Sequence, residues 1–136
     1  MIYFFDEDNK IPDFNSEFFR LWLSNIESNE DITLGDISFI FQNNSFIRKM
    51  NIDYLNHDYD TDVITFDYSE NNIISGDIFI NIDFVQSFSS SNNIPFNNEL
   101  SRIIIHGVLH LCGYNDKSSN EKDLMTAREN FYLSLQ

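Results

Sequence analysis

The pattern of apolar and polar positions along the 136-residue chain predicts alternating strands and helices. Short runs rich in β-branched and aromatic residues, bounded by turn residues, predict strands at 1–5, 36–42, 62–66 and 76–82. Apolar residues at spacings of three and four predict helices between and after these strands. The segment between the last two strands suits a hairpin or meander.

The first helix is expected to begin at Asp13 or Asn15, with Ser16 as its cap. Its predicted apolar face consists of Phe18, Leu21, Trp22 and Ile26. A second helix covers 45–56 and leaves Arg48 and Lys49 pointing outward. Its predicted apolar face consists of Phe46, Ile47, Met50 and Tyr54.

The C-terminal third of the chain predicts two more long helices. One begins at Asn97 or Asn98 and runs to Cys112, with Glu99 in its first turn, where a negative charge favours the helix dipole. The last begins with a capping box of Ser118 and Glu121. A short helix is expected at 84–88.

The resulting order, β-α-β-α-β-β-α-α, predicts an α/β (α+β) fold around a small mixed sheet packed with helices. A chain of this length can bury a real core but is too short for two ordinary domains. Residues 1–136 are therefore expected to form a single domain.

Charge and cysteine content narrow the range of functions. The chain has 22 acidic and 8 basic residues, a formal net charge of −14, which disfavours broad nonspecific binding of nucleic acid but permits a local basic cleft. The single cysteine suits a reducing compartment. With no basic segment before the first apolar run, and no apolar run near the ~20 residues of a membrane helix, a soluble cytoplasmic protein is expected.

Two of the three histidines lie four residues apart in the stretch HGVLHLCGYND, residues 106–116. Side chains at i and i+4 project from the same side of a helix, so His106 and His110 can bind one metal ion. Gly113 stands where a helix usually ends, and a reversal there would carry Asp116 back over the histidines as a third ligand. The structural alternative is a pair of buried histidines whose ring nitrogens form hydrogen bonds with groups in the core.

The spacing H-x-x-x-H-x-x-G-x-x-D resembles the frame of metzincin peptidases, H-E-x-x-H-x-x-G-x-x-H. Gly107 replaces the glutamate that serves as general base in those enzymes. A peptide-cleaving function is therefore not expected.

The same stretch resembles the signature H-G-x-L-H-L-x-G-Y-D-H of the YbeY-type rRNA maturation endoribonucleases. The segments TDVITF (61–66) and SGDIFI (75–80) are similar to the family's T-D-V-L-S-F and L-G-D-I-x-I, and KMNIDYL (49–55) to its L-N-x-x-Y-R. The matching motifs cover most of residues 37–116 in the family's order.

The resemblance implies a four-stranded mixed sheet and one Zn²⁺ per chain on His106, His110 and Asp116, with the two histidines as catalytic residues. It also implies cleavage of single-stranded RNA in maturation of small-subunit (16S) ribosomal RNA and in ribosome quality control. The expected partners are ribosomal RNA and the small ribosomal subunit or its assembly factors. Binding to a membrane or to DNA is not expected. A ribosome-assembly binding factor with a mainly structural metal and weak or no catalysis is the alternative.

Two positions depart from the family pattern. Asp116 replaces the third histidine, and Leu55 replaces an arginine expected to hold the scissile phosphate. Arg102, four residues before His106, is the leading candidate to replace that arginine because it shares the histidines' side of the helix. The others are His57, Arg48 and Lys49.

Three further residues have a structural and a functional interpretation. Asp62 and Asp77, at the starts of two strands, would either orient the ligand histidines or cap turns and strand ends. Cys112 points away from the ligand side of its helix and is expected to be a core thiol.

Overall fold

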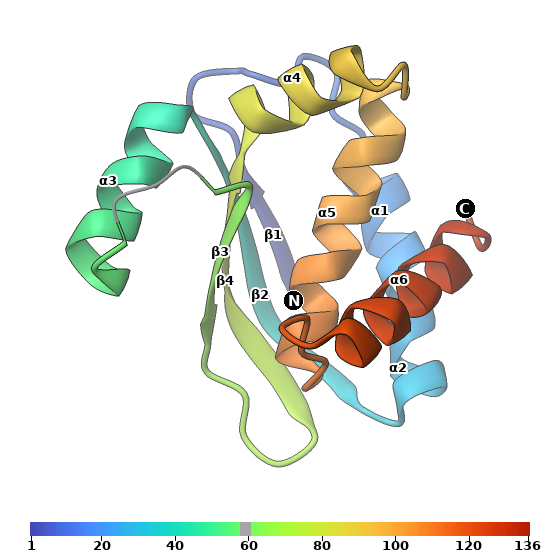
Figure 1. Cartoon of the computed structure of the whole chain (residues 1–136). Coiled ribbons are helices and arrows are strands. Elements are labelled where there is room, and N and C mark those ends of the chain that lie inside the picture. The colour runs from blue at the N-terminus through green and yellow to red at the C-terminus, as the bar shows by residue number, and fades with distance from the viewer. Residues whose placement is uncertain (58–60) are drawn as a thin grey trace.

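A computed structural model describes residues 1–57 and 61–136, in which a four-stranded sheet is covered by helices (Figure 1). The elements, in chain order, are β1 (Ile2–Phe5), α1 (Ser16–Leu23), α2 (Asn25–Glu30), β2 (Thr33–Gln42), α3 (Asn44–Leu55), β3 (Val63–Asp67), β4 (Ile73–Asn81), α4 (Ile82–Ser91), α5 (Phe96–Leu111) and α6 (Ser119–Leu133).

The sheet has the order β1-β2-β4-β3 and is mixed, as the sequence predicts. Strands β1, β2 and β4 are parallel, and β3 pairs antiparallel with β4, with Val63 opposite Ile80 and Asp67 opposite Gly76. The predicted hairpin and the predicted α/β (α+β) class are therefore confirmed.

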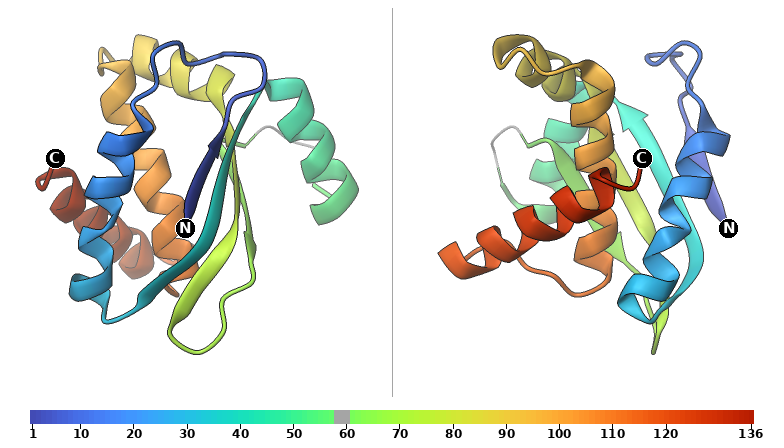
Figure 2. Two further views of the ribbon diagram at one scale, coloured as in Figure 1. Left: turned by 180° about the vertical axis from the view of Figure 1, so that it is seen from behind. Right: turned by 90° about the vertical axis from the view of Figure 1, so that its right-hand side faces the viewer.

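The two faces of the sheet carry different helices. Successive strand residues point to opposite faces, so Ile78 of β4 packs beneath α5 while Phe79 stacks on Phe46 of α3, with ring centroids 6.3 Å apart. Figure 2 shows α3 alone on one side of the sheet and α1, α5 and α6 on the other. Helix α5 forms the centre of the core, and Ile104, Ile105 and Leu109 are fully buried.

Helix α6 crosses α5 (Figure 1) and is also joined to α1, because Trp22 Nε1 donates to the backbone oxygen of Tyr132 at 2.8 Å. The predicted capping box of α6 is confirmed by reciprocal hydrogen bonds between Ser118 and Glu121. Helix α5 begins at Phe96, directly after Pro95, instead of at the predicted Asn97 or Asn98.

The prediction for the first helix is wrong in its cap and partly wrong in its face. Asn15, not Ser16, caps α1 by accepting from the backbone N–H of Phe18. Phe18 and Leu21 are 42% and 75% exposed, whereas Phe19 is buried beside the correctly predicted Trp22 and Ile26. Consecutive apolar residues in EFFRLWL are compatible with two neighbouring helix faces, and only packing against the core selects one.

Two other predictions need correction. In α3, Ile47 is buried, and Phe46 and Tyr54 face the sheet against Phe79 and Phe66, as the predicted face requires, but they remain 42% and 69% exposed because α3 covers this side of the sheet only in part. The short helix expected at 84–88 is the longer α4, capped by Asn81. No helix in the described part of the chain is long and apolar enough to cross a membrane.

Gly107 allows α5 to approach the sheet closely. A Cβ atom at this position would lie 2.8 Å from Cγ2 of Ile78, which is closer than carbon atoms can pack without movement. A glutamate at position 107 does not fit this packing. The contact between α5 and β4 therefore disfavours a glutamate at the position where metzincin peptidases carry their base.

Gly107→Ala is expected to destabilise the protein, because overpacking costs about 1–3 kcal/mol and outweighs the gain of about 0.8–1.0 kcal/mol in helix propensity. In an Ile78→Ala background, which removes the obstructing methyl group, the same substitution should become stabilising by up to about 1 kcal/mol. Urea unfolding of the four proteins measures both effects. Equal effects in the two backgrounds would contradict the proposed contact.

Candidate metal centre

The chain reverses direction after α5, in the turn of residues 112–116, which we call the α5–α6 turn. Gly113 has φ of +104°, a backbone conformation that favours glycine. The N–H of Tyr114 donates to the carbonyl of Leu109 and that of Gly113 to His110, each at 3.0 Å, which is the Schellman arrangement. The reversal brings Asp116 back over α5, as the sequence predicts.

The three predicted ligand residues lie together in the structure. The Nε2 atoms of His106 and His110 are 2.9 Å apart, and Oδ2 of Asp116 lies 3.3 Å from each. All three side chains are half-buried, and this group is able to hold a metal ion. A tetrahedral zinc site with ligand distances of about 2.0–2.1 Å separates its ligand atoms by about 3.3 Å. The cluster fits that size.

The hydrogen-bond partner of Nδ1 in each ring indicates which ring nitrogen carries the proton. His110 Nδ1 lies 2.9 Å from the carbonyl oxygen of Tyr114, which can only accept, so this nitrogen carries the proton. His106 Nδ1 lies 2.6 Å from a carboxylate oxygen of Glu129 and donates to it. In the neutral rings both Nε2 atoms therefore present lone pairs toward each other and toward Asp116. A cation between them, either a proton or a metal ion, relieves this repulsion.

Glu129 is not among the residues predicted from the sequence. It lies on α6, is 6% exposed, and joins His106 to Arg102, whose Nη1 donates to its second oxygen at 2.8 Å. A carboxylate behind a metal-binding histidine fixes the ring orientation and increases its basicity. A sequence signal exists, because Met125, Glu129 and Tyr132 share one buried face of α6 and a charged residue is unusual there.

The electrostatic environment of His106 favours positive charge. Burial alone would lower its pKa, but the hydrogen bond to Glu129 and the negative charges of Glu129, Asp62 and Asp116 outweigh burial and raise the pKa. In the metal-free protein a proton therefore competes for this site. Metal binding must displace that proton, so metal affinity is expected to fall at low pH.

The hypothesis that Asp62 or Asp77 orients a ligand histidine is wrong, because Glu129 and the Tyr114 carbonyl occupy those positions. Asp77 instead accepts from the hydroxyl of Tyr68 at 3.3 Å. Asp62 acts on His106 only through its charge. The partners of the two histidines come from α6 and from the α5–α6 turn. The local sequence around β3 and β4 does not reveal where these two elements lie.

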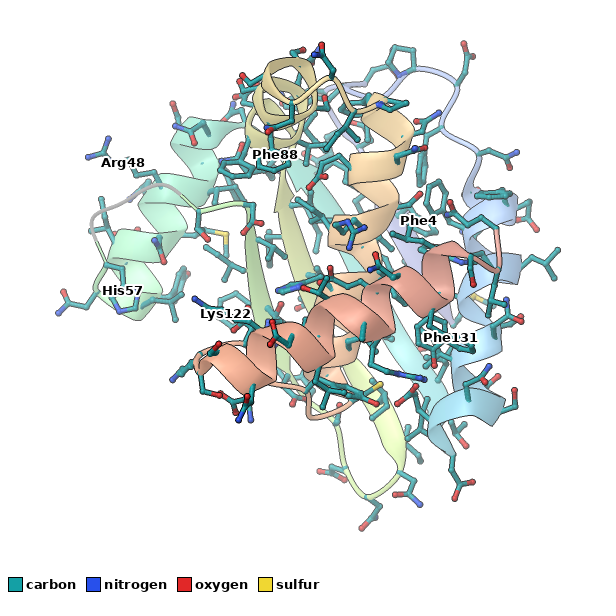
Figure 3. All side chains as sticks on the ribbon, turned by 45° about the vertical axis from the view of Figure 1, so that its right-hand side comes forward. Phe4, Arg48, His57, Phe88, Lys122 and Phe131 are labelled. Carbon is teal, nitrogen blue, oxygen red and sulfur yellow. The ribbon has the colours of Figure 1, made fainter. Side chains whose placement is uncertain are left out.

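The candidate phosphate contacts lie in two places. Arg102 lies on the ligand side of α5, as predicted, and its terminal nitrogens donate to Glu129 and Asn130, each at 2.8 Å. Lys49 pairs with Asp53 at 2.8 Å on the exposed side of α3. Figure 3 shows Arg48 on the outer side of α3 and His57 near the end of that helix. A phosphate-binding role for any of them stays a prediction.

Cys112 is half-buried, packs against the core and is not part of the metal cluster, as expected for a core thiol. Burial, together with the charges of Glu30 and Asp67, raises the pKa of this thiol to about 12. Because the thiolate is the reactive form, the folded protein should alkylate very slowly at neutral pH.

Iodoacetamide labelling of Cys112 at pH 8 is expected to be about three orders of magnitude slower in the folded than in the unfolded chain, whose thiol has a pKa of about 8.5. The folded-state rate should rise about tenfold per pH unit up to the raised pKa. Mass spectrometry of timed samples measures both rates. A folded-state rate within tenfold of the unfolded one would contradict the burial argument.

Glu129→Gln is expected to weaken zinc binding by about 10–100-fold, because the neutral amide gives His106 a poorer acceptor than the carboxylate. Competition with a chromophoric chelator measures the affinity. Glu121→Gln is the matched control on the same helix. Position 121 lies outside the cluster, and glutamine can replace glutamate in a capping box. Equal affinities of the two variants would show that Glu129 has no role in the site.

A mixed four-stranded sheet with a His–His–Asp cluster at the end of its central helix defines a protein with a candidate metal centre on an α+β scaffold. The chain belongs to the YbeY family: the family model described as "Endoribonuclease YbeY" matches residues 2–135. The sequence-based family assignment is therefore confirmed.

Individual relatives agree with this assignment. A protein of Phocaeicola vulgatus named endoribonuclease YbeY is 43% identical over 135 residues, which cover 99% of this chain and 98% of the relative. Its namesake from Bacteroides fragilis is 42% identical over 130 residues, covering 96% and 94%. A solution structure from Thermotoga maritima has a TM-score of 0.67 at 24% identity, covering 98% of this chain and 87% of that one, and supports the fold alone.

Proposed function

We propose that this protein is a zinc-dependent endoribonuclease that cleaves single-stranded RNA. We further propose that it acts in maturation of small-subunit (16S) ribosomal RNA and in ribosome quality control, with ribosomal RNA and the small subunit or its assembly factors as partners. Family membership supports the reaction class. The observation that carries the metal dependence is the convergence of two Nε2 atoms and one carboxylate oxygen.

His106, His110 and Asp116 would hold one zinc ion and leave a fourth position open to water or substrate. When bound, zinc supplies a Lewis acid that activates water and neutralises charge on a phosphate oxygen. Two neutral imidazoles and one carboxylate leave the loaded site with a net charge of about +1. On a chain with a formal charge of −14, this local positive charge favours binding of a phosphodiester at the site.

The residues around the cluster have separable roles in this proposal. Glu129 and the Tyr114 carbonyl hold the two rings in the tautomers that direct lone pairs inward. Gly107 leaves no room for a carboxylate base of the peptidase type. Asp116, in place of a third neutral ligand, makes the loaded site a weaker Lewis acid than a His₃ site would be.

A second candidate is a ribosome-assembly factor in which the metal is mainly structural. The pairing of cations with carboxylates favours it, because such cations are less available to phosphates. The pairs are Arg20–Glu17, Lys49–Asp53, Arg102–Glu129 and Arg128–Glu30. Leu55, in the place of the family's arginine, favours the same alternative. RNA cleavage separates the two candidates.

The zinc-loaded protein is expected to cleave a single-stranded fragment of 16S ribosomal RNA and to spare the same sequence in a duplex. His110→Ala should slow cleavage by about 10³-fold, equivalent to about 4 kcal/mol of lost transition-state stabilisation. Gel analysis of end-labelled RNA measures the rates. Elemental analysis should find about one zinc per chain in the wild type and little in His110→Ala, while His57→Ala, the matched control, keeps its zinc.

Cleavage that persists in His110→Ala at the wild-type rate would contradict the proposed role of the metal. A zinc-loaded wild-type protein that cleaves none of its candidate RNAs, free or within the small subunit, would favour the assembly factor.

A further inference from the structure

The α5–α6 turn is held by packing of Cys112 and Tyr114 against the core and by hydrogen bonds. Tyr114 is central to it: its carbonyl oxygen accepts from Nδ1 of His110, and Asp116 follows two residues later. A pocket of about 390 Å³ lies against the turn, and Cys112, Gly113 and Asn115 are among its lining residues. Because this side of the turn borders a pocket, side-chain contacts on its other sides add to the backbone hydrogen bonds that fix its position.

The side chain of Tyr114 makes one such contact. Its hydroxyl donates to Oε1 of Glu30 at 2.7 Å, across 84 positions of the sequence. Glu30 is the last residue of α2, and its side chain is 8% exposed. Tyr114 therefore binds α2 through its phenol and His110 through its backbone carbonyl.

Glu30 is itself firmly held. Its second oxygen accepts from a guanidinium nitrogen of Arg128 and from the hydroxyl of Tyr132, both on α6. Burial would raise the pKa of Glu30, but these three donors and the charge of Arg128 outweigh burial and lower it. The carboxylate thus stays ionised and joins three segments that are distant in the sequence, α2, the α5–α6 turn and α6.

We propose that Glu30 is a positioning residue for the metal centre, which it serves by anchoring the phenol of Tyr114. With the phenol fixed, the Tyr114 carbonyl stays within hydrogen-bond distance of His110 Nδ1, and the turn delivers Asp116 to the two histidines. The inference rests on the proposed function only in assigning the cluster to a metal. Glu30 lies outside the family motifs quoted above and makes no contact with the ligand atoms.

Two tyrosine variants test this inference, because Tyr114 and Tyr132 each give one hydroxyl hydrogen bond to the same carboxylate. Tyr114→Phe removes the hydroxyl anchor of the α5–α6 turn, whereas Tyr132→Phe removes a donor on α6 and leaves that anchor in place. Zinc affinity should fall about tenfold in Tyr114→Phe and stay within about twofold of wild type in Tyr132→Phe. Competition with a chromophoric chelator measures the affinities, and thermal unfolding of the metal-free variants measures stability.

A general structural role would lower thermal stability in both variants and would not distinguish them in zinc affinity. Equal affinity losses, or no loss in Tyr114→Phe, would overturn the inference. A double-mutant cycle with Glu30→Gln adds a second test, since the loss in Glu30→Gln/Tyr114→Phe should not exceed the larger single loss if both act through one contact. Additive losses would overturn it.

The visible absorption spectrum of the cobalt-substituted protein reports the geometry of the metal ligands and does not depend on the stability of the fold. Tyr114→Phe should alter the visible bands, because the ligand geometry changes, while Tyr132→Phe should leave them unchanged. Identical spectra in wild type and Tyr114→Phe would overturn the inference. Zinc affinity and RNA cleavage are measured separately, so a failure of the proposed function is distinguishable from a failure of this inference.

Discussion

When both rings are neutral, the Nε2 lone pairs of His106 and His110 face each other, with these atoms 2.9 Å apart, because Nδ1 of each ring donates its proton to another acceptor. Two such atoms beside the carboxylate of Asp116 repel one another in a half-buried site, where water screens charge poorly. The rest of the structure has to hold this arrangement against that repulsion. Side-chain contacts from outside the histidine helix contribute to this, from Glu129 on α6 and Glu30 on α2.

Two buried carboxylates contribute to that support. Glu129 holds His106 directly, and Glu30 holds the turn that carries Asp116. Each is paired with an arginine, Arg102 and Arg128 respectively, so neither negative charge is buried alone. Two of the few cations on this acidic chain therefore stabilise its fold. Any RNA bound by the protein has to depend more on a metal and on the remaining side chains than on these arginines.

Local features of the fold and site could be predicted from the sequence, whereas long-range contacts could not. His106, His110, Gly113 and Asp116 lie within eleven residues, and helix geometry with a glycine reversal is enough to bring them together. Glu129 reaches His106 across 23 positions and Glu30 reaches Tyr114 across 84, so only the packing of α2 and α6 reveals them.

The central claim is that the cluster binds a metal through two imidazole nitrogens and one carboxylate oxygen, and X-ray absorption at the zinc edge of the loaded protein tests it most directly. The account predicts a first shell of nitrogen and oxygen at about 2.0–2.1 Å, with the outer-shell scattering of two imidazoles. Sulfur at about 2.3 Å would place zinc on Cys112, and fewer than two imidazoles would contradict the proposed site.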